Sequence, residues 1–222
     1  MSARAQGRTG GREEAAAERR SAILRAAEQL FAAHGYHGVS IRNIADAANV
    51  PLALVGYYFG LKAQLYQTIF RERSGYIHDR LRSLADAQRN TPAEHLLEEI
   101  VKAFVLPVLD VAATDDGRVF LRLLSRGMTE QLVEDEPVIS ELFDPLAHAF
   151  IDALTAAQPG VRRETVAWCY QFALGALLHH VTDERIRRLS PGAARQRHRA
   201  RSLLVLFVSN GIRGACTASI GA

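Results

Sequence analysis

The sequence has only two cysteines, Cys169 and Cys216, which lie far apart without the spacing of a metal site. No apolar run reaches the ~18 residues that a bilayer-spanning helix needs. Residues 1–20 lack the apolar core of a secretion signal. These absences predict a cytoplasmic protein with two inert thiols and no membrane partner.

Motifs of the common catalytic classes are also missing. The sequence has no Gly-rich phosphate loop, no GxSxG nucleophile elbow and no HExxH helix. We therefore expect no catalytic residue, no cofactor and no resident metal. One alternative stays open, because His148 with Asp152 and His179 with Asp183 are pairs four residues apart that could bind a metal across two helices. In that alternative, a helical body binds a metal or small molecule in an enzymatic or adaptor role, without reading DNA sequence.

The composition is typical of a helical globular protein. The chain has 222 residues, of which 48% are hydrophobic and 7% aromatic, and Ala, Leu, Arg and Glu are frequent. We find neither a strand pattern nor a repeat of fixed period, so the predicted fold class is all-α. The formal net charge of +3 is compatible with a nucleic-acid partner.

The segment from Ser40 to Lys62 carries most of the functional information. Ser40 suits the N-cap of a helix whose narrow apolar face includes Ile44. Asn49 tolerates the left-handed conformation of a helix end, and Pro51 suits the first turn of a second short helix. Two short helices joined by a tight turn form the unit that places a helix in the DNA major groove.

The same segment carries a family resemblance. A Ser, then Ile-Arg-x-Ile-Ala, a Val, an aromatic pair ending in Tyr-Phe, and Lys together resemble the DNA-binding domain of the tetracycline-repressor (TetR) family. The resemblance covers roughly Ile23 to Tyr66, and residues 67–222 share only the family's length and helical pattern. It implies a non-enzymatic, homodimeric transcriptional regulator, most often a repressor that a small molecule releases from a palindromic operator in double-stranded DNA.

The resemblance also implies DNA contacts. Positions that usually touch phosphates or base edges are Ser40, Arg42, Tyr57, Tyr58 and Lys62. The recognition helix opens on Pro51-Leu52-Ala53, so base readout would depend on Leu52 and Leu54 against thymine methyl groups, on Tyr57 and on DNA shape. Gly56 replaces the family's usual Tyr and Leu61 its usual Ser or Asn cap, while Phe59 is expected in the core.

The predicted domain organisation has three parts and about nine helices. Residues 1–12 form a disordered basic leader, residues 13–60 a three-helix helix-turn-helix head, and residues 61–222 a helical effector-binding and dimerisation body. The expected helices cover residues 13–34, 40–48, 51–59, 61–87, a segment opened by Thr91-Pro92, segments after Asp116 and Pro137, 163–182 and 194–213. Pro107 should kink one of them, and Ser190-Pro191-Gly192 should form a loop.

The last two long helices are the expected dimer surface. The helix over residues 163–182 is apolar nearly all round, and Ala173, Gly175 and Ala176 would allow a close approach. Packed with residues 194–213 of both protomers, it would form a two-fold four-helix interface. The alternative is that this helix forms the core of a monomer.

The resemblance further implies an effector cavity in the body. Its mostly apolar wall would select a hydrophobic effector such as a fatty acid, an acyl thioester or an aromatic compound. Arg122 or Arg126 could pair with a carboxylate or phosphate, or belong to a solvated face. The candidate cavity residues, any of which could instead be plain core, are Phe104, Phe120, Leu123, Leu124, Met128, Phe150, Trp168, Tyr170, Phe172 and His179.

Overall fold

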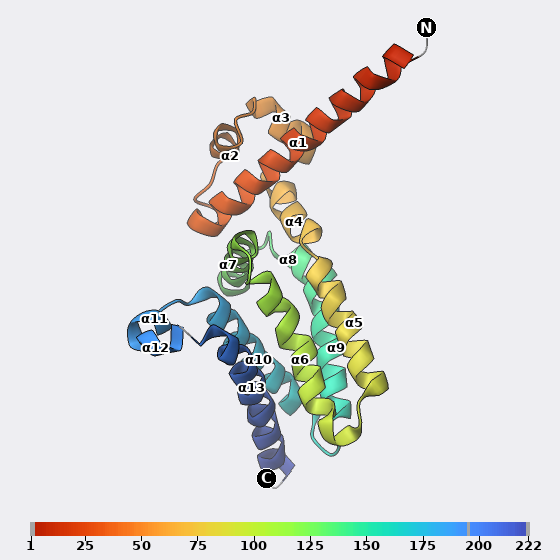
Figure 1. The fold of residues 1–222 in the computed structure, drawn as a ribbon, viewed down its shortest axis with the longest axis vertical. Coiled ribbons are helices and arrows are strands. Elements are labelled where there is room, and N and C mark those ends of the chain that lie inside the picture. Colours follow the sequence, from red (N-terminus) through yellow and green to blue (C-terminus); the bar gives the residue numbers. More distant parts are fainter. Residues whose placement is uncertain (1–2, 195, 221–222) are drawn as a thin grey trace. The chain divides into compact units, whose positions relative to one another are not determined.

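The computed structural model describes residues 3–194 and 196–220, and within these ranges the chain forms helices and no strand (Figure 1). The predicted all-α class is confirmed. None of the helices in the described ranges is long and apolar enough to cross a membrane. The chain divides into two compact units, the first containing residues 1–73 and 122–135, and the second residues 74–121 and 136–222.

The first unit contains α1 (Ala3–His34), α2 (Ile41–Ala47), α3 (Leu52–Phe59) and α4 (Lys62–Glu72). As predicted, α1 ends at His34 and is followed by Gly35, which has a φ of 73° and donates its N–H to the Phe31 carbonyl at 2.9 Å. The predicted leader is wrong from Ala3 onward, because α1 begins there rather than at residue 13. The Glu-, Ala- and Arg-rich stretch that follows propagates the helix through Gly10 and Gly11 despite their low helix propensity. Residues 1–2 lie outside the described ranges.

The helix expected over residues 61–87 is broken in two. α4 ends at Glu72, and α5 (Gly75–Asn90) begins after Arg73 and Ser74. The Nε and Nη2 groups of Arg73 donate to the buried carboxylate of Glu28 at 2.9 and 2.7 Å. Ser74 and Gly75 are weak helix formers, which favours a break at this point. The ion pair between Arg73 and Glu28 then fixes the end of α4 against α1.

A segment distant in sequence completes the first unit. The Tyr66 hydroxyl on α4 donates to Asp135 Oδ1 at 2.7 Å, and the Leu132 N–H donates to Asp135 Oδ2 at 3.1 Å. The Gln67 side chain donates to the Glu134 carbonyl at 3.2 Å. The compact units therefore differ from the predicted boundary at residue 60, because residues 61–73 and 122–135 pack with the head.

The second unit is a helical bundle. It holds α5, α6 (Ala93–Val111), the first turns of α7 (Asp115–Glu130), α8 (Glu136–Val138), the π-helical η1 (Ile139–Phe143), α9 (Asp144–Ala156), α10 (Arg163–Thr182), α11 (Ile186–Leu189), α12 (Pro191–Ala194) and α13 (Arg197–Ile220). Helices α5, α6 and α9 pack on one another, and α10 contacts both α9 and α13 (Figure 1). α13 also packs on α6.

Several predicted helices of this unit differ in detail. α10 has the predicted bounds, whereas the expected helix after Pro137 is divided into α8, η1 and α9. Pro145 lies in the first turn of α9 and has no N–H to donate to the preceding turn, which accounts for the irregular entry. Pro92 precedes α6 as its N-cap, and α6 continues through Pro107 to Val111. The expected loop at Pro191 starts α12, and the last helix spans residues 197–220 instead of 194–213.

Candidate nucleic-acid interface and effector site

Local hydrogen bonds fix both the start of α2 and the turn that follows it, where the Val50 N–H donates to the Ala45 carbonyl at 3.0 Å. Ser40 Oγ accepts from the Asn43 N–H at 3.1 Å, and Asn43 Oδ1 accepts from the Ser40 N–H at 2.9 Å. Two backbone N–H donors at the start of α2 are thus satisfied, as in a capping box. Asn49 has a φ of 52°, and Pro51 is the N-cap of α3. The predicted helix-turn-helix geometry is confirmed.

The core of the head determines which face of α3 is presented. Val55 and Phe59 are buried, the latter as predicted, and they anchor one side of α3. Tyr57 on the opposite side is 79% exposed, and Leu52 is 45% exposed. The head therefore leaves a large Tyr and a Leu on α3 exposed to solvent. Exposed apolar side chains of this kind are available to contact a partner.

The predicted DNA contacts lie at or near the surface of the first unit. Five of them are exposed, namely Ser40, Arg42, Pro51, Leu52 and Tyr57, and three are half-buried, namely Leu54, Tyr58 and Lys62. The Tyr57 and Tyr58 rings meet edge to face with centroids 5.2 Å apart. A Cβ added at Gly56 would meet nothing within 4 Å, so the position lies open beside them. Their roles as DNA contacts stay predictions.

Lys62 is held at the start of α4 by aromatic rings. Its Nζ lies 4.2 Å from the centroid of the buried Tyr36 ring, a cation–π arrangement. Burial lowers the pKa of Lys62, and the negative charge of Glu134 opposes this shift. The Leu61 N–H donates to Gln64 Oε1 at 2.8 Å, so Gln64 supplies a partner for the helix end where the family's usual polar cap is missing.

A Lys62→Ala substitution should weaken DNA binding by a similar factor on every sequence. The lysine offers charge without a base-reading geometry, so the slope of log affinity against log salt should fall by about 1. Titrations with operator and random duplexes at several salt concentrations measure both quantities. Lys102→Ala is the matched control, because the chain's other lysine is paired with Glu98 and Glu99 on α6. A changed sequence preference in Lys62→Ala would contradict the phosphate role.

The predicted cavity residues are divided between the two units. Phe104, Phe120, Phe150 and Tyr170 are buried in the second unit. Leu123, Leu124 and Met128 belong to the first unit, because the division between the units falls after residue 121 within α7. Arg122 and Arg126 lie there as well, and Arg126 pairs with Glu130 at 3.3 Å.

Trp168 and Phe172 lie on the surface of the second unit and not in its interior, where the predicted cavity wall would place them. They are 63% and 67% exposed on α10, with their rings stacked at a centroid distance of 6.0 Å. Because α10 is apolar nearly all round, its sequence does not indicate which side faces inward. Phe207 on α13 is likewise 70% exposed, and Leu203 and Leu206 are exposed beside it in sequence. We call these five side chains of α10 and α13 the aromatic face.

The buried aromatic residues surround an arginine that the sequence prediction missed. Arg80 on α5 is only 4% exposed, and its Cζ lies 4.5 Å from the ring centroid of Phe104 and 5.1 Å from that of Phe150. The Phe104 ring also meets the Phe150 and Tyr170 rings edge to face, at 5.3 and 5.5 Å. The sequence does contain a signal for its burial, because Arg80 lies at helical spacing between the apolar Tyr76 and Leu84.

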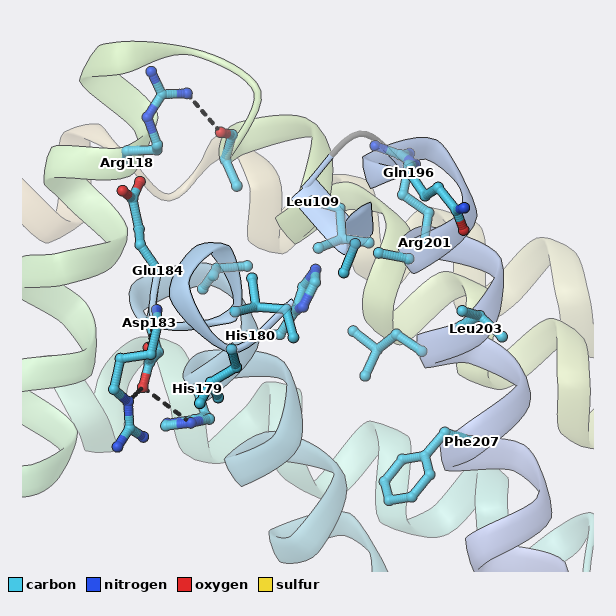
Figure 2. Close-up of a pocket in the computed structure, with 18 of the residues that line it drawn as sticks. Leu109, Arg118, His179, His180, Asp183, Glu184, Gln196, Arg201, Leu203 and Phe207 are labelled. Atoms are coloured by element: carbon cyan, nitrogen blue, oxygen red, sulfur yellow. Dashed lines mark hydrogen bonds and ion pairs between the residues drawn. The ribbon is translucent and has the colours of Figure 1, made fainter. Parts of the chain in front are cut away.

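A surface pocket of about 760 Å³ lies elsewhere in the second unit (Figure 2). Its walls come from the ends of α6 and α10, from Arg118 near the start of α7, from α11 and α12, and from the first half of α13. The arginines in its wall already have acidic partners: Arg118 with Asp115, Arg185 with Asp183, and Arg201 with Asp110. His179 lies 3.3 Å from Asp183. Of the predicted cavity residues, only His179 lines this pocket.

The metal alternative has no site in the described part of the chain, where no group of three or more His, Cys, Asp or Glu side chains could hold an ion. Asp152 is instead engaged by Arg163 at 2.8 Å, and Asp183 by Arg185 at 2.6 Å. Cys169 and Cys216 are buried, and burial raises the pKa of both thiols, that of Cys216 to about 11. Both therefore carry little thiolate at neutral pH.

Two family models match the chain where these features lie. The model described as "Bacterial regulatory proteins, tetR family" matches residues 23–69, which include the capped α2, the turn at Asn49 and α3. The model described as "Tetracyclin repressor-like, C-terminal domain" matches residues 102–211. The chain belongs to the TetR family.

Individual relatives match only part of the chain in sequence. The chain is 38% identical to the HTH-type transcriptional regulator RutR of Escherichia coli K12 over 64 residues, covering 29% of this chain and 30% of RutR. It is 36% identical to the HTH-type transcriptional repressor Rv3405c of Mycobacterium tuberculosis H37Rv over 135 residues, 60% of each chain. The matches therefore span less than two thirds of these relatives. The structure of PfmR from Thermus thermophilus shares the fold, with a TM-score of 0.58 and 18% identity over 84% of this chain and 91% of PfmR.

Proposed function

We propose that this TetR-family protein is a ligand-responsive transcriptional repressor that binds a palindromic operator as a homodimer. The observation that carries the proposal is the helix-turn-helix of α2 and α3, in which Val55 and Phe59 anchor α3 to the head while Tyr57 and Leu52 stay exposed. In this proposal α3 enters the major groove, and Ser40, Arg42 and Lys62 contact the flanking phosphates. A small hydrophobic effector taken up by the second unit lowers the affinity for DNA.

The aromatic face supports the homodimer. Large apolar side chains on the adjacent helices α10 and α13 are exposed in a single chain, whereas monomeric proteins rarely leave a contiguous apolar patch of this kind uncovered. A second copy related by two-fold symmetry would cover it with the same residues. The same symmetry would present two heads to the two half-sites of a palindrome.

Binding to the DNA upstream of the protein's own gene tests the regulator proposal. We expect a dimer to retain sequence-selective binding in excess nonspecific competitor, with affinity that falls steeply as salt rises. A gel-shift titration combined with sedimentation analysis measures affinity and stoichiometry together. Weak binding that any competitor abolishes to the same extent would support the alternative of a small-molecule-binding helical protein without sequence-specific DNA reading.

Tyr57→Ala should lower operator affinity while leaving the fold and the dimer intact. The side chain is so exposed that its removal opens no cavity, whereas loss of one good base or backbone contact costs about 1–3 kcal/mol in binding. Gel-shift titration and thermal unfolding measure the two effects separately. Tyr57→Phe is the control that removes only the hydroxyl. A large drop in unfolding temperature in Tyr57→Ala would show that the residue is structural.

A further inference from the structure

The Arg80 site in the second unit has unusual hydrogen bonding. Within the described residues, its buried Nε and Nη2 atoms have no hydrogen-bond partner. The buried hydroxyl of Tyr76, one turn earlier on α5, also has none. Buried polar groups are nearly always paired, and an uncompensated buried charge is strongly unfavourable.

The surrounding rings compensate only part of this charge. Phe104 and Phe150 stabilise the guanidinium through cation–π contacts, but they do not replace the missing hydrogen bonds of two N–H groups. Burial raises the pKa of both Tyr76 and Tyr170, and the charge of Arg80 opposes the shift in each case. Both phenols therefore stay protonated near neutral pH, and both lie within electrostatic reach of Arg80.

We propose that Arg80 receives the carboxylate of an amphipathic effector whose apolar part packs among Phe104, Phe120, Phe150 and Tyr170. A guanidinium donates two parallel hydrogen bonds to a carboxylate, which would satisfy the donors that now lack partners. Tyr76 would add a third donor. This inference rests on the proposed function and specifies its effector as a monocarboxylate with an aliphatic or aromatic body.

The surface pocket is a poorer receptor for an anion. Its Arg118, Arg185 and Arg201 already pair with aspartates, so a ligand carboxylate would have to displace an existing partner. Arg80 offers a buried, unpaired positive charge in a site lined by rings. Because this site is closed, binding requires helices α5, α6, α9 and α10 to separate. A ligand that binds only the separated arrangement would shift the protein toward it.

The test uses carboxylates and alcohols with the same carbon skeletons. Octanoate is compared with 1-octanol, and 4-phenylbutyrate with 4-phenylbutanol, by calorimetric titration and thermal shift on the full-length dimer. We expect at least one carboxylate to bind roughly tenfold or more tightly than its alcohol. Arg80→Met should remove this preference and leave the alcohol's affinity nearly unchanged. Its unfolding temperature should equal or exceed that of the wild type, because the variant replaces an uncompensated charge with an apolar side chain.

Arg80→Lys and Arg201→Met complete the design. Arg80→Lys keeps the charge without the two-pronged geometry and should retain part of the preference, which also provides a readout if Arg80→Met does not fold. Arg201→Met, in the surface pocket, should retain all of it. Equal affinity for carboxylates and alcohols in the wild type, absence of binding by both series, or an unchanged preference in both Arg80 variants would overturn the proposal.

Operator binding is measured separately in the same samples. If carboxylates bind through Arg80 but leave operator affinity unchanged, the ligand-responsive function is wrong and the anion site stands. If carboxylates release the operator equally from the wild type and from Arg80→Met, the regulator proposal stands and the Arg80 site is wrong. The two failures are thus distinguishable.

Discussion

Phe207→Glu should convert the protein into a monomer at concentrations where the wild type is a dimer. Phe207 is 70% exposed on α13 within the aromatic face, and a two-fold interface would contain it twice. A cost of about 2 kcal/mol per copy gives about 4 kcal/mol per dimer, which raises the dimer dissociation constant roughly 10³-fold. Sedimentation equilibrium over a dilution series measures this change directly.

The same variant should lose most of its operator affinity with its head unchanged. A dimer binds its second half-site at a high effective concentration, and a monomer loses that advantage. Val133→Glu is the matched control, because Val133 is also apolar and highly exposed (82%) but lies outside α10 and α13. Phe172→Glu on α10 should reproduce the effect of Phe207→Glu. A Phe207→Glu protein that stays dimeric would show that the subunits meet elsewhere.

The parts of this fold that the sequence predicted well depend on short-range chemistry. The end of α1 at Gly35, the cap at Ser40, the left-handed Asn49 and the start of α3 after Pro51 each follow from one residue and its immediate neighbours. The bounds of α10 were also correct, because Thr182 is followed by a polar segment that interrupts its long apolar run.

The parts that the sequence did not predict depend on tertiary contacts. The division between α4 and α5 requires Glu28 of α1 to bind Arg73, and no local pattern shows that pairing. The outward position of Phe172 depends on which side of an apolar helix packs on α9 and α13. The spacing of Arg80 between Tyr76 and Leu84 hints at burial, but the rings that bury it lie on α6, α9 and α10, which are distant in sequence.

Asp135→Ala should destabilise the first unit by about 3 kcal/mol. Asp135 is buried and accepts hydrogen bonds from the Tyr66 hydroxyl and the Leu132 N–H, so its removal leaves two donors without a partner. Chemical denaturation measures the loss of unfolding free energy. Asp110→Ala, which breaks the exposed pair with Arg201, is the control and should cost less than about 1 kcal/mol.

A double-mutant cycle with Tyr66→Phe assigns this energy to the hydrogen bond. We expect an interaction energy of about 1.5–3 kcal/mol between residues 66 and 135. If the costs of the two single substitutions were additive, Asp135 would stabilise the unit through other contacts.

The Tyr66–Asp135 hydrogen bond also bears on the effector response, because α7 carries residues of both compact units and residues 122–135 pack with the head. The milder Tyr66→Phe protein should therefore still bind its operator but show a smaller effector-induced loss of affinity. An undiminished response would mean that the change reaches the head by a route other than the Tyr66–Asp135 contact.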